Sequence, residues 1–562
     1  MSYKSNLNPM FRSQWSENIF NQKYKHQGAE TWTELAGTVV NDVCSVAGKA
    51  FSQEDKDQLE EYIRDLKFIP GGRYLYYAGR DNKFFNNCYL LKAEEDTRED
   101  WADLSWKSES CLMTGGGIGI DYSVYRPEGS LIKRTGGQAS GPIPKMNMIN
   151  EIGRRVMQGG SRRSAIYASL NWKHGDIEQF LKAKDWASMP VGSTGKTLWD
   201  IKQEDFNFPA PLDMTNVSVN YDTEWLLKYY ETGDPGEVFK ANVRQAMQSA
   251  EPGFSFNFFD KEKETLRNAC TEVTSEDDSD VCNLGSLNFG RIESLQELTN
   301  VVRLSVMFLL CGTLKAELPY PKIGLVRAKN RRLGLGFMGV HEWLLKKNSR
   351  YEVTPELHQW LTVYKGESDK VSKEFADTLS ITRPVANRAI APTGSIGILA
   401  GTSTGIEPIF AAAYKRRFLS GKDKWKYVYV VDDVTQVLVE QGHDPDKIET
   451  ALDLASDYER RIKFQADVQD YVDMSISSTI NLPPWGNKLN NEDTVDKFSS
   501  TLAKYASRLR GFTCYPDGSR GGQPLTSVPY SEAVTKLGDE FAESIETHDI
   551  CDITGVGGSC GV

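Results

Sequence analysis

From residue 67 to about residue 530 the sequence alternates helical segments with short apolar or glycine-bounded runs. Four of these runs are NNCYLL (86–91), IGIDYSV (118–124), SAIYASL (164–170) and AIAPTGSIGILAG (389–401). Strands that alternate with helices build α/β folds, because each crossover helix returns the chain for a parallel strand. The alternation therefore predicts an α/β architecture with a largely parallel sheet.

Two terminal regions lie outside this alternation. Residues 1–66 are predicted to be a helical N-terminal region, because DKDQLEEYIRDLKF (55–68) places apolar residues at helical spacing beside charged ones. Residues 531–562 are predicted to be a C-terminal segment, and its small-residue-rich end has the composition of a mobile tail. A chain of 562 residues exceeds one ordinary compact domain, so we expect one large catalytic domain over 67–530 with two appendages.

Charge and hydropathy restrict the partners. A net charge of −11 and a pI near 5.4 argue against a general nucleic-acid binder, although a nucleotide can still bind at a local basic cluster. The apolar stretch VVRLSVMFLLCGTL (301–314) contains Arg303 and is too short to span a bilayer, so it is interpreted as a buried helix. The N-terminus has no apolar signal region, and we expect a cytoplasmic protein without a membrane partner.

A few of the cysteines are candidates for redox catalysis, although each one taken alone is more simply interpreted as a buried structural thiol. There are nine cysteines, an odd number, and no C-x-x-C motif, which weakens both a disulfide scaffold and a structural zinc site. Most are expected to be buried. The six histidines occupy no obvious catalytic context, so a thiol hydrolase is a poor alternative.

The stretch RNACTEV (267–273) contains an unusual set of polar residues. In an extended strand, positions i, i+2 and i+4 share one face. Asn268, Cys270 and Glu272 are therefore predicted to form a row of amide, thiol and acid. Such a row is odd for a core and natural for a reaction site.

Three glycine-rich stretches allow an anion site or a simple turn. LGLGFMG (333–339) contains a G-x-G-x-x-G pattern but lacks the context of a dinucleotide site, and we interpret it as close helix packing. PTGSIG (392–397) offers hydroxyls and backbone N–H groups at a helix start, which suits an anion as well as a capped turn. QGGSRRSA (158–165) places two arginines in a glycine loop, either as a phosphate contact or as a solvated turn.

Taken together, the motifs resemble the large catalytic subunit of ribonucleotide reductases, which remove the 2'-hydroxyl of ribonucleotides. The resemblance runs in consistent order from about residue 67 to 520. It rests on PGGRYLYYAG (70–79), NNCYLL, TGGGIG (114–119), GGQASGP (136–142), GGSRRSA (159–165), N-x-C-x-E (268–272), CNLGSLN (282–288), KNRRLGLGFMG (329–339), APTGSIGILAGTSTGIEP (391–408) and GFTCYPDGSR (511–520). It implies a ten-stranded α/β barrel of two antiparallel halves, with a central finger loop carrying the radical cysteine.

The resemblance also implies roles for five residues. Cys270 matches the residue that becomes a thiyl radical and removes the 3'-hydrogen of the ribose. Glu272 matches the base for the 3'-hydroxyl, and Asn268 matches the hydrogen-bonding amide beside it. Cys88 and Cys282 match the thiol pair that supplies two electrons and ends as a disulfide.

Further residues are assigned by the same resemblance to the substrate, to an allosteric effector and to the reductant. The expected substrate contacts are Asn87, Pro392, Thr393, Gly394 and Ser395, the last three holding phosphates. The expected contacts of a dNTP effector are Asp96, Arg134, Arg162 and Arg163. Cys551 and Cys560 are candidate tail thiols for exchange with a thioredoxin or glutaredoxin-like protein, although their eight intervening residues depart from the closely spaced family pair. The matches begin by residue 70, which implies that the family's N-terminal ATP cone is absent.

The radical source divides the family into classes. Class I enzymes receive the radical from a separate ferritin-like dimetal subunit through two adjacent tyrosines, whereas this chain has Thr513-Cys514-Tyr515 there. One tyrosine favours the adenosylcobalamin-dependent class II, with a cone-less class I enzyme and Tyr515 as a radical relay as the alternative. A homodimer is expected, because family effector sites form between subunits. A catalytically silent nucleotide-binding protein with the same barrel is the alternative function.

Overall fold

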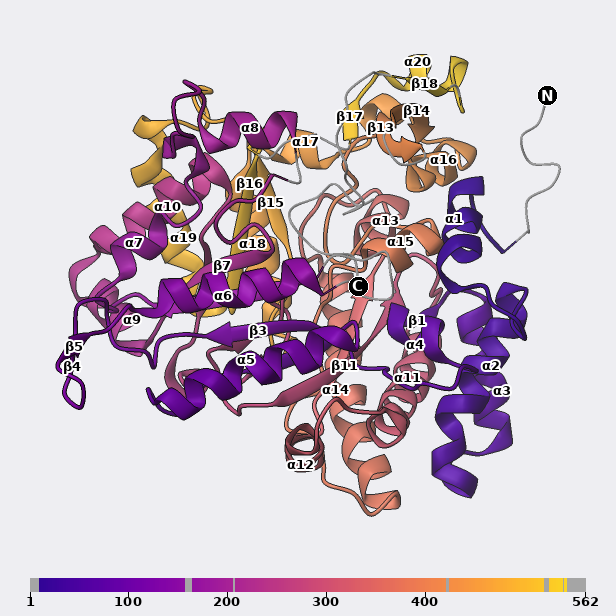
Figure 1. Ribbon diagram of the computed structural model, residues 1–562. Helices are drawn as coiled ribbons and strands as arrows, with labels where there is room; N and C mark the ends of the chain where they lie inside the picture. The colour runs from indigo at the N-terminus through magenta and orange to yellow at the C-terminus, as the bar shows by residue number, and fades with distance from the viewer. Residues whose placement is uncertain are drawn as a thin grey trace.

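The computed structural model describes residues 10–156, 164–205, 208–420, 424–519, 525–538 and 540–542 (Figure 1). Four residues with predicted roles lie outside the described residues: Arg162, Arg163, Cys551 and Cys560.

The first half of the central barrel is a parallel sheet of five strands. They are β2 (Cys88–Leu91), β3 (Gly117–Asp121), β6 (Ile166–Asn171), β7 (Thr215–Tyr221) and β8 (Gly253–Phe256), hydrogen-bonded in that order. The helices between these strands include α5 (Arg98–Met113), α6 (Pro142–Arg155), α7 (Ile177–Leu181), α8 (Leu198–Glu204), α9 (Thr223–Thr232) and α10 (Glu237–Ser249). Of the predicted runs, the one at 86–91 contains β2, and those at 118–124 and 164–170 overlap most of β3 and β6.

The second half is also parallel and joins the first half antiparallel at both edges. Its strands are β11 (Asp280–Asn288), β12 (Leu333–Met338), a bridged segment at 388–390, the segment from Ile476 into β15 (Thr479–Leu482), and β16 (Gly511–Pro516). β11 pairs antiparallel with β2, and β16 pairs antiparallel with β8. The ring therefore closes with five strands in each half. The prediction of a largely parallel sheet is confirmed, because the antiparallel pairings of the ring are the two junctions between its halves.

The helices of the second half cover the outside of its strands (Figure 1). They are α11 (Leu295–Lys315), α12 (Pro321–Asn330), α13 (Val340–Lys346), α14 (Pro355–Thr378), α15 (Gly394–Ala400), α18 (Tyr458–Gln469) and α19 (Val495–Tyr505). LGLGFM forms strand β12 itself, so its glycines do not serve helix packing as predicted. A Cβ at Gly336 would lie 2.5 Å from the carbonyl oxygen of Ala389, which shows that glycine allows the neighbouring barrel segment to approach.

A short hairpin passes through the barrel interior. β9 (Leu266–Arg267) and β10 (Thr274–Ser275) pair antiparallel, and residues 268–273 form its tip, which we name the finger loop. The hairpin crosses β3 at Gly119, where a Cβ would lie 1.6 Å from the carbonyl oxygen of Arg267. Any larger side chain at position 119 would occupy the space of the Arg267 backbone, so this glycine admits the finger loop.

The N-terminal region packs against the second half of the barrel. It contains α1 (Gln14–Ile19), the π-helix η1 (Phe20–Tyr24), α2 (Trp32–Cys44), the 3₁₀-helix η2 (Ser45–Ala50) and α3 (Gln53–Arg64), then β1 (Phe68–Pro70) and α4 (Gly72–Tyr77). Trp32, Leu35 and Ile63 share one buried cluster with residues of α11 and α14. Helix α11 is long and apolar enough to span a membrane by composition, but 72% of its most apolar window is buried. It is a core helix, as predicted from 301–314.

The remaining elements do not belong to the barrel sheet. A second, four-stranded antiparallel sheet has the order β17 (Leu525–Ser527), β13 (Ala413–Ser420), β14 (Lys424–Val431) and β18 (Glu540–Ala542). Shorter elements are β4 (Leu131–Ile132), β5 (Gly137–Gln138), η3 (Trp186–Ser188), η4 (Phe259–Lys261), α16 (Asp433–Glu440), η5 (Pro445–Lys447), α17 (Ala451–Leu454), η6 (Glu492–Thr494), η7 (Ala506–Arg508) and α20 (Tyr530–Thr535). The predicted divisions 1–66, 67–530 and 531–562 stay a prediction.

Candidate active site

The finger loop is a tight turn, not the extended strand predicted for RNACTEV. The N–H of Thr271 donates to the carbonyl oxygen of Asn268 at 2.9 Å, and Thr271 has a φ of 70°. This turn interrupts the two-residue alternation of a strand, so the predicted row of Asn268, Cys270 and Glu272 is wrong in its geometry. The three residues are nevertheless all buried at the tip of the same hairpin.

Asn268 fixes the loop with both ends of its carboxamide. Its Oδ1 accepts from the N–H of Val273 at 2.9 Å, and its Nδ2 donates to Sγ of Cys88 at 3.0 Å. The first bond closes the loop, and the second connects it to strand β2. The amide therefore positions the finger loop against the first thiol of the predicted redox pair.

Cys88 and Cys282 face each other across two antiparallel strands. They are direct register partners of β2 and β11, and both are buried free thiols. Opposite residues of an antiparallel pair have Cα atoms roughly 4.5–5.5 Å apart. That separation lies in the range that a disulfide requires. Burial, with the charge of Glu272 as a smaller cause, raises the pKa of Cys88 well above its usual value.

Glu272 is a fully buried carboxyl group whose side chain has no hydrogen-bond partner among the described residues. Both of its side-chain oxygens lack one, while its backbone carbonyl accepts from the N–H of Ser475 at 2.8 Å. Burial raises the pKa of Glu272 to about 7. The neighbouring Asn268 amide lowers this pKa, but its effect is smaller than that of burial. A carboxyl group that titrates near neutrality suits general acid–base catalysis.

The predicted phosphate loop begins beside the thiol pair. Ala391 shares a buried cluster with Cys88 and Cys282, and the chain continues from it into Pro392. Thr393 adopts a left-handed conformation with φ 52°, and its Oγ1 accepts from the N–H of Gly405 at 2.8 Å. Gly394 and Ser395 begin helix α15. The loop is thus held rigidly with hydroxyls and backbone N–H groups together.

Asn87 precedes Cys88 and is equally buried. Neither polar atom of its carboxamide has a hydrogen-bond partner among the described residues. A buried unpaired amide is costly unless a ligand or water satisfies it. This observation agrees with the predicted substrate contact.

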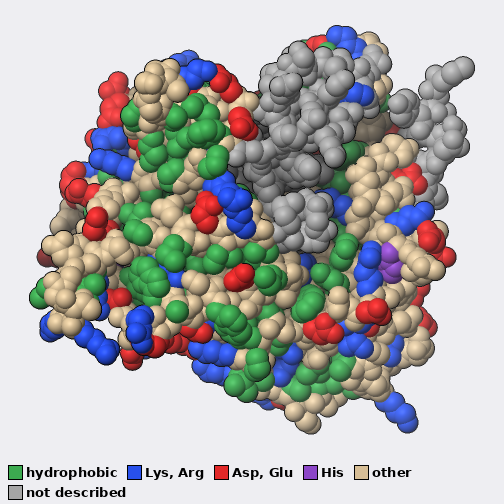
Figure 2. Space-filling model, viewed as in Figure 1, with side chains coloured by type: hydrophobic (Ala, Val, Ile, Leu, Met, Phe, Trp, Pro, Cys, Tyr) green, Lys and Arg blue, Asp and Glu red, His purple; other side chains and the backbone are tan. Residues whose placement is uncertain are grey.

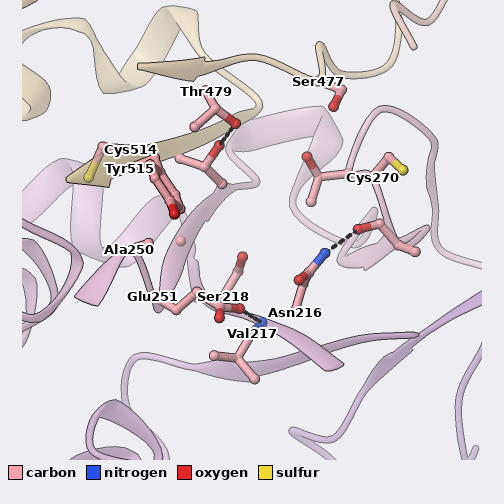
Figure 3. A pocket seen from close by; sticks show the side chains of 14 residues that line it. Asn216, Val217, Ser218, Ala250, Glu251, Cys270, Ser477, Thr479, Cys514 and Tyr515 are labelled. Carbon is pink, nitrogen blue, oxygen red and sulfur yellow. Dashed lines mark hydrogen bonds between the residues drawn. The ribbon is translucent and has the colours of Figure 1, made fainter. Parts of the chain in front are cut away.

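A pocket lies on another side of the finger-loop tip (Figure 3). Cys270 lies at one end of it, and Tyr515 of β16 lies across from it (Figure 3). Asn216 of β7 donates from Nδ2 to the carbonyl oxygen of Ala269 at 3.1 Å, which holds the residue next to Cys270. The lining is Asn216, Val217, Ser218, Ala250, Glu251, Gly253, Ala269, Cys270, Thr271, Ser477, Thr479, Thr513, Cys514 and Tyr515.

The two predicted effector residues that the structure describes, Asp96 and Arg134, lie near the start of helix α5. Asp96 forms an ion pair with Arg126 and also accepts from its backbone N–H at 3.2 Å. Arg134 is exposed in the turn between β4 and β5, and with Arg98 it lowers the pKa of Glu99. Asp96 therefore has a structural partner, and an effector role for it stays a prediction.

Sequence reasoning missed several residues of the site. Asn216 and Thr479 line the pocket but belong to strands whose sequences carry no distinguishing motif. Gly119 belongs to the glycine-rich stretch TGGGIG, but it lies in strand β3 and not in a turn. Its role is to admit the finger-loop hairpin, which is formed by residues far along the chain. The only sequence signal for this role was the glycine in an otherwise apolar strand.

These features define a class of protein before any comparison. A closed α/β barrel places a thiol on an interior loop, next to two further thiols in register for a disulfide and a carboxyl group that titrates near neutrality. Dithiol pairs of this kind exchange two electrons. The arrangement is that of a thiol-dependent oxidoreductase with a buried site.

The comparisons identify the family. The ribonucleotide reductase barrel domain matches residues 86–192, 222–358 and 384–515, more than half of the chain. The chain therefore belongs to the ribonucleotide reductase family, and the predicted fold of this family is confirmed.

Named relatives extend the similarity over most of the chain. A vitamin B12-dependent ribonucleoside-diphosphate reductase of Mycobacterium tuberculosis (strain CDC 1551 / Oshkosh) is 26% identical, over 85% of this chain and 74% of the relative. A protein of Mycobacterium phage D29, provisionally named an adenosylcobalamin-dependent ribonucleoside-triphosphate reductase, is 26% identical over 97% of this chain and 98% of its own length. The class Id ribonucleotide reductase alpha subunit of Actinobacillus ureae has the same fold, with a TM-score of 0.70, 17% identity, and coverage of 90% and 97% of the two chains.

Proposed function

We propose that this chain is an adenosylcobalamin-dependent ribonucleotide reductase that converts ribonucleotides to 2'-deoxyribonucleotides. The observation that carries the proposal is the meeting of Cys270, Glu272 and the pair Cys88–Cys282 at one buried loop. Binding a nucleotide alone would not require these groups, which argues against a silent regulatory protein. The cobalamin-dependent relatives support the choice of cofactor.

Each residue has a step in the proposed reaction. A thiyl radical on Cys270 removes the 3'-hydrogen of the ribose and becomes a thiol. Glu272 takes the proton of the 3'-hydroxyl, the 2'-hydroxyl leaves as water with a proton from one thiol of the Cys88–Cys282 pair, and Glu272 later returns its proton to the 3'-oxygen. Cys88 and Cys282 supply two electrons and two protons and become a disulfide. Cys270 then returns the hydrogen atom to C3' and regains its radical.

Other residues hold the substrate in this scheme. Thr393, Gly394 and Ser395 bind its phosphates, with Pro392 shaping the loop, and Asn87 bonds the nucleoside through its unpaired carboxamide. Asn268 acts by fixing the finger loop, because both ends of its amide are already used within the protein. A rigid loop of this kind favours catalysis, since a small misplacement of the reacting thiol is costly.

We assign the nucleoside part of the cofactor to the pocket beside Cys270. Hydroxyls of Ser218, Thr479 and Thr513 and the ring of Tyr515 line it, which is a suitable mixture of polar groups and an aromatic face. Bound adenosylcobalamin would supply the oxidising equivalent that forms the Cys270 radical. The residues of this pocket would hold its nucleoside and keep bulk water from the thiol.

The wider assembly is also part of the proposal. Trp106 and Met113 on α5 and Met148 on α6 are exposed, and Figure 2 shows hydrophobic side chains over these helices. This face suits a homodimer with dNTP effectors bound near Asp96 and Arg134. A thioredoxin or glutaredoxin-like protein would restore the dithiol through Cys551 and Cys560, in the cytoplasm.

Activity with purified components tests the proposal. The wild-type protein, a ribonucleoside di- or triphosphate, dithiothreitol, a dNTP effector and adenosylcobalamin are expected to yield the deoxynucleotide, measured by chromatography. Cys270→Ala should yield none, whereas Cys111→Ala, which removes a buried thiol of α5, should retain activity. Absence of product from wild type, with or without a ferritin-like subunit, would contradict the function.

Tyr515 distinguishes the two radical sources. If the cofactor supplies the radical directly, Tyr515→Phe should retain activity within a few-fold, since the ring remains. If a ferritin-like subunit supplies it through Tyr515, the phenol is required and the same variant should be inactive. Product formed only in the presence of that subunit would overturn the cobalamin assignment.

A further inference from the structure

The N-terminal segment lies along helix α15, which follows the phosphate loop (Figure 1). Ser16 Oγ donates to the carbonyl oxygen of Ile398 at 2.8 Å, and Arg12 Nη1 donates to that of Gly401 at 2.7 Å. Arg12 also holds both carboxylate oxygens of the buried Glu342 at 2.8 Å. These charged and polar contacts fix α1 against the barrel at the end of the loop region.

The π-helix η1 continues from α1 and places Lys23 at the phosphate loop. Nζ of Lys23 donates to Oγ of Ser395 at 2.8 Å, across 372 positions of sequence. Ser395 is buried, and Lys23 is half-buried. Phe20 and Tyr24 of the same helix are buried, and Phe20 packs on Phe11 with ring centroids 6.0 Å apart. The packed aromatic side chains hold η1, so the position of Lys23 is set by the core of the N-terminal region.

Two cations of this segment contact helix α15, Arg12 at its C-terminal end and Lys23 at its first turn. Arg12 is neutralised by a carboxylate, as expected of a buried structural ion pair. Lys23 donates at the loop to the hydroxyl of Ser395, which is itself a predicted phosphate ligand. An ammonium group has three N–H donors and attracts phosphate as a point charge. Its location next to Ser395 would therefore add a positive charge to a loop that otherwise offers only hydroxyls and backbone N–H groups.

We propose that Lys23 is a substrate-binding residue whose ammonium group contacts the phosphates of the ribonucleotide, so that the N-terminal region completes the active site. The inference rests on the proposed function, because Thr393–Ser395 is the phosphate loop of that function. It goes beyond the function by assigning a binding residue to the region before residue 67, which none of the motifs of the barrel includes.

Binding measurements separate this inference from the activity. We would titrate wild type, Lys23→Ala and Lys25→Ala with CDP and with inorganic pyrophosphate by calorimetry, without any cofactor. Lys25 is a matched control, because it lies two residues away and pairs with Glu30 on the surface. Loss of a charge-assisted contact should weaken binding of both probes by about ten- to hundredfold in Lys23→Ala. Lys25→Ala should remain within about twofold of wild type.

Turnover and a conservative variant complete the experiment. Lys23→Ala should raise KM for the ribonucleotide by a similar factor with little change in kcat, and Lys23→Arg should restore most of the affinity. Lys23→Met keeps the aliphatic stem and replaces Lys23→Ala if the latter unfolds. Unchanged affinity in Lys23→Ala, equal weakening in Lys25→Ala, or failure of wild type to bind either probe would overturn the inference. Binding with the expected Lys23 dependence but without turnover would support the inference while contradicting the proposed function.

Discussion

Two sides of the finger loop differ in how they are built. On one side, Cys88, Cys282 and Glu272 are buried, and strand register with the Asn268 bond fixes the loop against the thiol pair. On the other side, Cys270 borders a pocket whose lining is rich in hydroxyls, such as those of Thr479 and Thr513, which bond each other at 3.0 Å. The first side is buried and holds the proposed redox pair, and the second is a place where a further group can approach the thiol.

This difference suits two separate requirements of the proposed reaction at Cys270. A radical intermediate needs exclusion of water, which the buried side provides. Formation of the radical needs access from outside, which the pocket provides. Variants around the finger loop test this difference, from the largest expected effect to the smallest.

Removal of the second thiol of the pair should have the largest effect. Cys282→Ser should lower multiple-turnover activity by at least about 10³-fold, because no disulfide can take up the oxidation. Deoxynucleotide formation measures this loss. Cys311→Ala is the control, since Cys311 is a buried thiol in another core cluster, and it should keep activity within a few-fold. Equal losses in both variants would show that the buried side is merely a packed core.

Substitution of Glu272 should cause the second-largest loss of activity. Glu272→Gln should lower activity by roughly 10³-fold, because the amide cannot accept the proton. Wild-type activity should rise with pH through about 7, as the carboxylate forms. A flat pH profile between pH 6 and 8 would argue against Glu272 as the base.

Glu272→Gln should also change how folding stability depends on pH. The pKa of Glu272 is about 7 in the folded protein and lower in the unfolded chain, so the unfolded state binds fewer protons between those pH values. Folding stability from this group is thus full below the unfolded pKa and is lost as pH rises through about 7. The difference between the pKa of Glu272 in the folded protein and the ordinary pKa of a glutamate corresponds to about 3 kcal/mol. Urea unfolding at pH 5 and 8 should show Glu272→Gln gaining relative stability at pH 8, unlike the exposed control Glu231→Gln.

Gly119 tests whether the hairpin must pass through the barrel. Gly119→Ala would overlap the Arg267 carbonyl, so the finger loop must move, with about 10²-fold lower activity and about 3 kcal/mol lower stability. Gly366→Ala is the control, because a Cβ there meets nothing within 4 Å in helix α14. It should stabilise the protein by about 0.5–1 kcal/mol. Activity and chemical unfolding of both variants measure this contrast.

The smallest effect is expected on the pocket side. Asn216→Ala removes the bond to the Ala269 carbonyl, and kcat should fall by about tenfold as the tip of the loop loosens. Asn220→Ala on the same strand removes a bond to Ser169 and should leave kcat within a few-fold. A steady-state assay at saturating substrate distinguishes the two. If both variants behave alike, the pocket side does not position Cys270.

Local sequence patterns predicted many of the strands and helices correctly. The runs that form β2, β3 and β6 and the buried helix α11 followed from periodicity, because strand and helix formation depend on neighbours in sequence. The same reasoning failed at RNACTEV, where a turn with a positive φ at Thr271 replaced the expected strand. Propensity could not anticipate this turn, because the Asn268 side chain closes the loop by bonding Val273.

The sequence by itself determined which residue types are available and, through the order of its motifs, the family of the chain. Only the tertiary structure decided how they meet: Asn268 bonds Cys88 across 180 positions, and Cys88 faces Cys282 through strand register. The entry of the hairpin past Gly119 and the reach of Lys23 to Ser395 belong to the same category. The physical reason is that contacts between distant segments depend on how the whole barrel closes, and no local pattern encodes that closure.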